Sequence, residues 1–313
     1  MNEKYKNALF LSDLDGTLLD RDAKIPAEAA EHLRRLHEAG VKVTFATART
    51  IATVKHILKD VPCPLPVALM NGVLLYSFAE NRYVSVSAFP LPCFSEAAER
   101  IRREGLSPFY YFLDGGNLVT CYEKVSCPAM ENFMRERQVK YGKQFTRVTW
   151  DEITEVLAGA SAGIFSGSSS DISPDISRKI PDKAVSTPLT PIYFCVIGPE
   201  NAVTAAASRC REIPGVRVEC YPDPHADVWY MEIFSASASK RSATRALRRL
   251  AGCDRIVAFG DNFNDLPMFE EADEAYAVST APEEVRRVAD STVARPEECG
   301  VTMKIASLTG VML

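Results

Sequence analysis

The chain has 313 residues, of which 47% are hydrophobic and 25% are charged. This length predicts two domains, and this composition excludes a disordered, collagenous or coiled-coil protein. The 36 basic and 41 acidic residues give a net charge of −5, which offers no electrostatic support for nucleic-acid binding.

The first seventy residues alternate between strand and helix patterns. Short apolar runs predict strands, and amphipathic stretches between them predict helices. Strands that alternate with helices at this spacing indicate a parallel sheet covered on both faces. In chain order, the predicted elements are a strand at Ala8–Ser12, a helix at Pro26–Ala39, a strand at Val41–Ala46, a helix at Ile51–Lys59 and a strand at Val67–Met70.

The C-terminal third repeats this alternation. Its predicted elements are a helix at Ser239–Leu250, a strand at Arg255–Phe259, a helix near Asn264–Glu270, a strand at Ala275–Ser279 and a helix from Pro282. The two ends of the chain, residues 1–82 and 231–313, therefore predict one α/β domain with a doubly wound parallel sheet.

Residues 83–230 have a different pattern from the two ends. Aromatic strand patterns at Phe109–Leu113, Leu118–Tyr122 and Tyr193–Ile197 are separated by helical stretches at Ser95–Arg103 and Glu200–Glu212. We expect a separate α/β domain that is inserted between the two halves of the first one. The stretch 166–191 is rich in serine and proline and is expected to be an irregular excursion of this insert.

Two acids follow the first predicted strand, in the heptapeptide DLDGTLL that begins at Asp13. Ligands of an open parallel sheet bind at the carboxyl ends of its strands, so Asp13 and Asp15 are expected at that edge. Gly16 permits the tight turn that follows. Two carboxylates so close together repel each other, and Mg²⁺ with its oxygen ligands suits them. The alternative is an Asp-Gly turn in which Asp13 is a solvated strand end.

The pattern D-x-D-G-T-L-L after a first strand resembles the haloacid-dehalogenase-like hydrolases. The resemblance implies that Asp13 is the nucleophile that accepts a phosphoryl group and that Asp15 is the general acid and base. Aspartate suits this chemistry because a covalent intermediate divides phosphate transfer into two in-line steps. The family pattern also implies further positions, which the sequence contains in the expected order.

One of these positions is a Thr or Ser at the end of the second strand. Residues 45–49, FATAR, look like the family's A-T-G-R with Ala48 in place of glycine. By this match, the hydroxyl of Thr47 and the backbone amides that open the next helix bind phosphate oxygens. The alternative is that Thr47 serves only as an N-cap of that helix.

Another position is a lysine at the start of a helix. Residues 237–243, SASKRSA, look like the family's S-K-G-x-A-L helix start, with Arg241 in place of glycine. The resemblance implies that Lys240 neutralises the nucleophile and holds the transferring phosphoryl group. Without the other motifs, a solvated helix lysine would be the preferred interpretation.

The last motif is GDNFNDLPMF, which begins at Gly260 and is very similar to the G-D-x-x-N-D signature of the Cof-type sugar-phosphatase branch. By that match, Asp261 is a metal ligand, Asn264 contacts phosphate and Asp265 supports the metal shell through water. An Asx-rich turn is the alternative, but it does not explain four such residues behind a buried strand. The pair Asn71 and Gly72 also matches this branch and is assigned a supporting role.

Together the motifs imply a Mg²⁺-dependent phosphatase that hydrolyses phosphate monoesters of small metabolites through an aspartyl-phosphate intermediate, with sugar phosphates as the first expected substrates. Mg²⁺ is expected between Asp13, the backbone carbonyl of Asp15 and Asp261. The insert stands where this branch carries its substrate-selecting α/β cap of the C2B type. Two alternatives stay open: a phosphotransferase or sugar-phosphate mutase on the same fold, and a catalytically silent protein that binds phosphometabolites.

The sequence also bears on location. The apolar run at Ala8–Leu11 is too short for a secretory signal, and no stretch approaches the ~18 apolar residues of a membrane helix. Nine scattered cysteines without a C-x-x-C pair suggest neither a disulfide framework nor a zinc site. We therefore expect a cytoplasmic protein with reduced thiols. Its expected partner is a small phosphorylated metabolite, not nucleic acid or a membrane.

Overall fold

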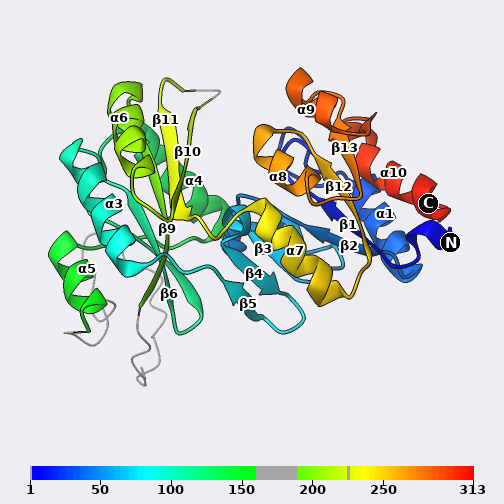
Figure 1. The fold of residues 1–313 in the computed structure, drawn as a ribbon, viewed down its shortest axis with the longest axis horizontal. Helices are drawn as coiled ribbons and strands as arrows, with labels where there is room; N and C mark the ends of the chain where they lie inside the picture. Colours follow the sequence, from blue (N-terminus) through cyan, green and yellow to red (C-terminus); the bar gives the residue numbers. More distant parts are fainter. Residues whose placement is uncertain (1, 160–188, 224–225) are drawn as a thin grey trace. The chain divides into compact units, whose positions relative to one another are not determined.

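The computed structural model describes residues 2–159, 189–223 and 226–313, which form two compact units (Figure 1). One unit comprises Met1–Ser87 and Ala236–Leu313, and the other comprises Ala88–Ser235. The sequence placed the boundaries at 83 and 230. The first segment of the first unit extends further because β5 (Arg82–Val86) pairs with β4 (Leu74–Ser77). Its second segment starts later, at Ala236, because β11 (Trp229–Ser235) belongs to the sheet of the second unit. Most of the expected excursion at 166–191 lies outside the described residues.

The first unit is built around a five-stranded parallel sheet in the order β14-β13-β12-β1-β2. Apolar runs such as ALFLS and RIVAFG suit its inner strands because both faces of a parallel sheet are covered. Ser12 of β1 lies opposite Phe259 of β12, so the residues after both strands emerge at one edge. The strands are β1 (Ala8–Ser12), β2 (Lys42–Phe45), β12 (Arg255–Gly260), β13 (Glu274–Val278) and β14 (Ser291–Val293).

Helices cover both faces of this sheet (Figure 1). Leu9 and Leu11 of β1 point to the face covered by α7, α8 and α9. On the other face, α10 packs against α1, and the ammonium of Lys304 lies 4.5 Å from the ring centroid of Tyr276. The predicted doubly wound α/β fold is therefore confirmed. The helices are α1 (Ala27–Glu38), α2 (Ile51–Ile57), α7 (Lys240–Ala251), α8 (Leu266–Phe269), α9 (Glu283–Val288) and α10 (Gly300–Thr309).

A small antiparallel sheet adds a further loop to the same edge. It consists of β3 (Val67–Leu69), β4 and β5. Ala68 of β3 forms a parallel bridge with Ala46, which follows β2. The short helix η2 (Met70–Gly72) after β3 therefore lies next to the loop that follows β2. The other short 3-10 helices described are η1 (Glu3–Tyr5), η4 (Phe263–Asp265) and η5 (Pro296–Glu298).

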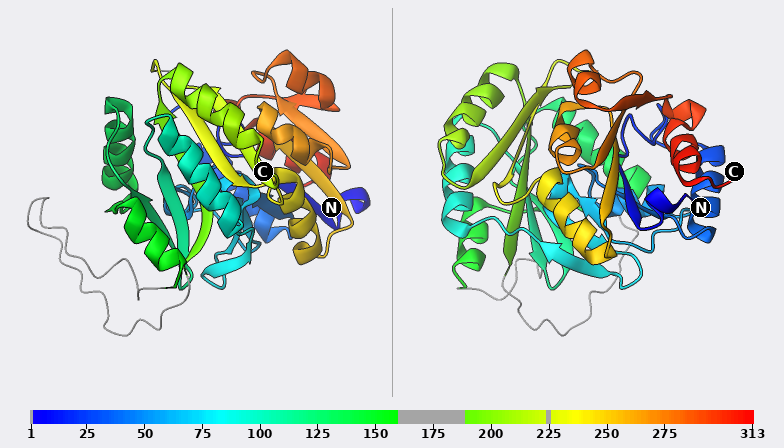
Figure 2. Two further views of the ribbon diagram at one scale, coloured as in Figure 1. Left: turned by 60° about the vertical axis from the view of Figure 1, so that its left-hand side comes forward. Right: turned by 45° about the vertical axis from the view of Figure 1, so that its right-hand side comes forward.

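The second unit has a six-stranded sheet in the order β10-β11-β9-β6-β7-β8. Its helices α3 and α6 lie side by side on one face (Figure 2), where Phe94 of α3 stacks on Phe194 of β9 with ring centroids 4.3 Å apart. The strands are β6 (Phe109–Asp114), β7 (Asn117–Tyr122), β8 (Thr146–Arg147), β9 (Thr190–Gly198), β10 (Val216–Pro222) and β11 (Trp229–Ser235). The helices are α3 (Leu91–Arg103), α4 (Pro128–Tyr141), α5 (Trp150–Leu157) and α6 (Glu200–Arg211).

Two further features concern the helices and the cysteines. Across the described residues, no helix is both long and apolar enough to cross a membrane. The nine cysteines are all free thiols.

Candidate active site

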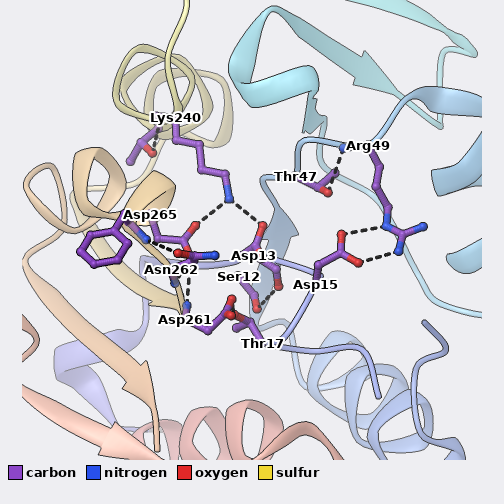
Figure 3. A network of polar contacts seen from close by, with 12 residues as sticks. Ser12, Asp13, Asp15, Thr17, Thr47, Arg49, Lys240, Asp261, Asn262 and Asp265 are labelled. Carbon is purple, nitrogen blue, oxygen red and sulfur yellow. Dashed lines mark hydrogen bonds and ion pairs between the residues drawn. The ribbon is translucent and has the colours of Figure 1, made fainter. Parts of the chain in front are cut away.

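Loops of the first unit meet at the carboxyl ends of its parallel strands (Figure 3). The loop after β1 carries Asp13 and Asp15, the loop after β2 carries Thr47, and the loop after β12 carries Asp261. Asp13 is buried, and its backbone N–H donates a hydrogen bond to the carbonyl of Phe259 at 2.9 Å. Strand pairing thus continues into the motif and fixes the backbone of Asp13.

The side chain of Lys240 reaches this edge from the start of α7. Ser239 caps the helix by accepting a hydrogen bond from the backbone N–H of Ser242 at 3.0 Å. The buried ammonium of Lys240 donates to Oδ1 of Asp13 and to Oδ1 of Asp265, at 2.6 Å in each case. This burial rules out the alternative of a solvated helix lysine.

Burial and charge together set the protonation of the cluster. Burial lowers the pKa of Lys240, but attraction by Asp13 and Asp265 outweighs this and raises its pKa above the ordinary value. Burial raises the pKa of Asp13 well above its usual range; Lys240 opposes this effect, and Asp265 and Asp261 reinforce it. Burial, reinforced by Asp265, raises the pKa of Asp261 to about 6. The cluster contains three carboxylates and one lysine, so it favours an additional cation.

Asp265 fixes the loop that follows β12. Its Oδ1 accepts from Lys240, and its Oδ2 accepts from the backbone N–H groups of Asp261 and Asn262 at 2.9 and 3.1 Å. A Cβ atom at Gly260 would lie 2.6 Å from the Asp265 side chain, so glycine is required there. Beside the role through water that the resemblance implied, Asp265 makes direct contacts with Lys240 and the loop backbone.

Asp261 is oriented by the loop after β1. The hydroxyl of Thr17 donates to Oδ1 of Asp261 at 2.8 Å. Gly16 has a φ of +73°, and a Cβ atom there would overlap the Asp261 carboxylate. Sequence reasoning assigned no role to Thr17, although the threonine of D-x-D-G-T was the available signal.

The acidic cluster fits a divalent metal ion. Asp13, Asp261 and Asp265 each offer a carboxylate oxygen, and these three atoms lie within 4.8 Å of one another. Oxygen donors and excess buried negative charge are what Mg²⁺ prefers. The carboxylate of Asp15 points toward Arg49 instead, so only its backbone carbonyl is left for the metal role that the sequence predicts (Figure 3).

Thr47 lies where the sequence predicts a phosphate-binding hydroxyl. Its backbone N–H donates to the carbonyl of Ala68, and its buried Oγ1 accepts from the backbone N–H of Arg49 at 3.1 Å. A hydroxyl that accepts one hydrogen bond keeps its own hydrogen for donation. Ala48 does not adopt the positive φ that favours glycine, so alanine is compatible with this loop.

Asn71 and Gly72 have a structural role beside the site. The backbone N–H of Asn71 donates to the carbonyl of Thr47 at 3.1 Å, which links two loops of the edge. Gly72 has a φ of +90°, and a Cβ atom there would overlap the carbonyl oxygen of Ser239. This close approach lets α7 begin next to the site and thereby places Lys240.

Two other predicted features lie at the margin of the cluster. Asn264 lies in η4 with an exposed side chain, and it is not among the residues joined to Lys240. Arg241, which replaces the family glycine, is a helical residue of α7 whose guanidinium pairs with Glu270 and Glu271.

Arg49 is a site residue to which sequence reasoning assigned no role. Its guanidinium forms a two-pronged ion pair with Asp15, with Nε at 2.7 Å from Oδ2 and Nη2 at 2.5 Å from Oδ1. The side chains of Arg49 and Asp15 are 20% and 49% exposed. The arginine of FATAR was the signal that could have identified this contact.

Comparison with known proteins identifies the family. Residues 10–305 match the family model of the haloacid dehalogenase-like hydrolases. The chain belongs to this family. YxeH of Bacillus subtilis (strain 168), named as a phosphatase, is 27% identical over 305 residues, which cover 96% of this chain and 97% of that protein. YwtE of the same strain, a 5-amino-6-(5-phospho-D-ribitylamino)uracil phosphatase, is 43% identical over 60 residues, or 19% of this chain and 20% of that protein.

Solved structures of the family share this fold. BT1666 from Bacteroides thetaiotaomicron has a TM-score of 0.70 at 21% identity, over 100% of this chain and 98% of its own. BT4131, described as a subclass IIB sugar phosphatase, has a TM-score of 0.65 at 19% identity, over 98% of this chain and 100% of its own. The resemblance drawn from the motifs is therefore confirmed, and the chain is a hydrolase of this family.

Proposed function

We propose that the chain is a Mg²⁺-dependent phosphatase that hydrolyses phosphate monoesters of small metabolites. The observation that supports this most directly is the buried 2.6 Å contact between Asp13 and Lys240 at the carboxyl edge of the parallel sheet. An ammonium in this position favours the ionised, nucleophilic form of Asp13 and attracts an incoming phosphate.

The chemistry takes two steps. In the first, an oxygen of Asp13 forms a bond to phosphorus while the bond to the ester oxygen breaks, and Asp15 donates a proton to that oxygen. In the second, Asp15 removes a proton from a water molecule, whose oxygen attacks phosphorus. The bond between phosphorus and Asp13 then breaks, which releases inorganic phosphate and restores the carboxylate.

Lys240, Thr47 and Asn264 are assigned to the phosphoryl oxygens. Lys240 supplies a fixed positive charge. The Thr47 hydroxyl accepts a hydrogen bond from the backbone N–H of Arg49, and this bond leaves the hydrogen of the hydroxyl for a phosphoryl oxygen. The assignment of Asn264 rests on the family motif, since its side chain is exposed.

Asp13, the backbone carbonyl of Asp15 and Asp261 are assigned as the protein ligands of Mg²⁺. When bound, Mg²⁺ would offset the negative charge of the carboxylates and the phosphate. Asp265 keeps the Asp261 loop in place through the two backbone hydrogen bonds described above.

Sugar phosphates are the proposed substrate class. The name of YwtE, which specifies a phosphorylated ribityl compound, and the description of BT4131 as a sugar phosphatase support this choice. We assign the unit Ala88–Ser235 as the cap that selects the substrate. We also propose a cytoplasmic location, which cell fractionation would test.

The deciding experiment measures release of inorganic phosphate from a panel of phosphorylated metabolites, with the Asp13→Asn variant as the control. We expect release by the wild-type protein and none by the variant. Transfer of the phosphoryl group to a sugar acceptor without free phosphate would indicate a phosphotransferase or mutase instead. Binding without turnover of any ester, including p-nitrophenyl phosphate, would indicate a silent binding protein.

A further inference from the structure

The ion pair between Arg49 and Asp15 raises a chemical difficulty. Both oxygens of the Asp15 carboxylate accept hydrogen bonds from the guanidinium, at 2.7 and 2.5 Å. Figure 3 shows the carboxylate turned toward Arg49 and away from the ammonium of Lys240. A carboxylate turned toward Arg49 does not face a phosphate ester beside Asp13 and Lys240, so the pair must open before Asp15 contacts the leaving group.

The structure allows the Arg49 side chain to move while its backbone stays in place. Its N–H donates to Oγ1 of Thr47, and its carbonyl accepts from the backbone N–H of Met70, each at 3.1 Å. The Asp15 side chain is 49% exposed, so its ion pair with Arg49 is only weakly stabilised. These two backbone hydrogen bonds hold the loop in place when the pair opens.

A phosphate ester is a direct competitor for Arg49. The planar guanidinium binds carboxylate and phosphate with the same two-pronged geometry. The backbone N–H of Arg49 donates to the hydroxyl of Thr47, which is assigned to the phosphoryl oxygens, so a phosphate bound there lies beside the arginine.

We propose that Arg49 exchanges partners when substrate binds. Its guanidinium leaves Asp15 for the phosphoryl group, and the released Asp15 turns to the ester oxygen. This inference rests on the proposed function, because it assigns Asp15 as the acid and a phosphate ester as the ligand. Arg49 is then both a phosphate-binding residue and the positioning residue that keeps Asp15 aside in the resting site.

The test is a double-mutant cycle in binding of inorganic phosphate, measured by calorimetry in buffer with Mg²⁺. The four proteins are the wild type, Arg49→Ala, Asp15→Asn and the double variant. Arg49→Ala should weaken phosphate binding about ten-fold or more. Asp15→Asn should strengthen phosphate binding, because the carboxylate that competes for Arg49 is gone. This gain in affinity should be at least three-fold larger in the protein with Arg49 than in the Arg49→Ala background.

Arg245 provides a matched control. Its guanidinium forms the same two-pronged pair with Glu271, at 2.7 and 2.6 Å, in the same unit. Arg245→Ala should leave phosphate affinity and the KM for esters unchanged. Arg49→Lys, which keeps the charge but loses the fork, should fall between the wild type and Arg49→Ala. Circular dichroism establishes that each variant is folded.

The proposal is overturned if Arg49→Ala binds phosphate as tightly as Arg245→Ala. It is equally overturned if Asp15→Asn has the same effect with and without Arg49, or if the wild type binds no phosphate. These outcomes do not depend on turnover. Failure of the proposed function would appear separately, as absence of phosphate release in the substrate panel.

Discussion

Nζ of Lys240 and Oδ1 of Asp265 lie 2.6 Å apart, although Lys240 begins α7 and Asp265 ends η4. Both side chains are almost fully buried. The other oxygen of Asp265 holds the backbone of Asp261 and Asn262. One carboxylate therefore joins the lysine beside the nucleophile to the loop that carries the proposed metal ligand.

Replacing Asp265 by alanine should affect both stability and turnover. Removal of one partner leaves a buried charge without full compensation, which lowers the free energy of unfolding by about 3–5 kcal/mol. Phosphate release should fall as well, because Lys240 and the Asp261 loop lose their common anchor. Urea unfolding followed by circular dichroism measures the first effect.

Glu283→Ala is the control for the loss of stability in Asp265→Ala, because it removes an exposed ion pair with Arg287 in the same unit. We expect little change in its unfolding midpoint. Equal midpoints for Asp265→Ala and Glu283→Ala would show that the buried pair does not stabilise the unit.

Gly72 offers a second test, through the position of α7. In Gly72→Ala, the new Cβ atom would overlap the backbone carbonyl of Ser239, so the start of α7 must shift and displace Lys240. Gly40→Ala is a matched control, because Gly40 also has a positive φ, +80°, but no atom lies within 4 Å of its Cβ position. Both variants should lose about 1–2 kcal/mol from the backbone conformation.

Only in Gly72→Ala should the rate of phosphate release also fall, by about ten-fold or more, since small displacements of catalytic groups reduce rates strongly. Steady-state kinetics on both variants make the comparison. Equal kcat values for the two variants would mean that Gly72 does not position Lys240.

The sequence predicted most of the strands and helices of the first unit because its patterns there are local. Runs such as ALFLS mark a buried strand, and Asp13 follows one directly, so its place at the sheet edge could be expected. The role of Gly72 could not be expected, because it depends on how closely η2 approaches the N-cap of α7. Such contacts between distant segments leave no local signal in a single sequence.

The second unit contains a buried lysine that gives a prediction on pH. Lys143 is buried and donates to the hydroxyl of Tyr111 at 3.1 Å. Burial, reinforced by Arg137, lowers its pKa to about 7 from an ordinary value of 10.5. Between these two pH values the unfolded chain binds a proton that the folded chain lacks, so stability rises with pH across this window.

The unfolding free energy of the second unit should gain about 2 kcal/mol from this group between pH 7 and pH 9. Lys143→Met should remove that gain and raise the stability at pH 7. Both tryptophans, Trp150 and Trp229, lie in this unit, so their fluorescence reports its unfolding. Lys140→Met, at an exposed position near the end of α4 and three residues before Lys143, should keep the wild-type pH dependence. An unchanged dependence in Lys143→Met would contradict the assignment.

Metal removal should abolish activity. Without a divalent cation, the carboxylates of Asp13 and Asp261 repel a phosphate dianion. EDTA should therefore stop phosphate release, and added Mg²⁺ should restore it. Asp261→Asn should raise the Mg²⁺ concentration for half-maximal rate about ten-fold or more. Asp254→Asn, an exposed change at the opposite end of β12, is the control, and full activity in metal-free buffer would refute the metal site.

The position of the Asp15 side chain also could not be read from the motif alone. The spacing of D-x-D-G-T places Asp13 and Asp15 on one short segment, and their mutual repulsion suggested a shared cation. In the structure the guanidinium of Arg49, in the loop after β2, forms an ion pair with the Asp15 carboxylate. A partner 34 residues away could not be assigned from residue types, because other arginines were equally available in the sequence.

The two aspartates after β1 should differ when each is replaced by asparagine. Asp13→Asn removes the nucleophile, so neither chemical step should occur with any ester. Asp15→Asn affects only the steps in which a proton moves. An alkyl phosphate has a strongly basic leaving group, so its first step should slow by ~10²–10⁴. The leaving group of p-nitrophenyl phosphate is stable as an anion, so its first step should survive.

With p-nitrophenyl phosphate, the second step of Asp15→Asn should stall because no group takes the proton from water. The aspartyl-phosphate on Asp13 should accumulate, and stopped-flow absorbance should show a burst of about one nitrophenolate per active site before a slow steady state. Rapid quench and mass spectrometry locate the added phosphate, with Asp13→Asn as the control that shows no burst. A phosphate found on another residue would contradict this mechanism, as would full steady-state turnover of a sugar phosphate by Asp15→Asn.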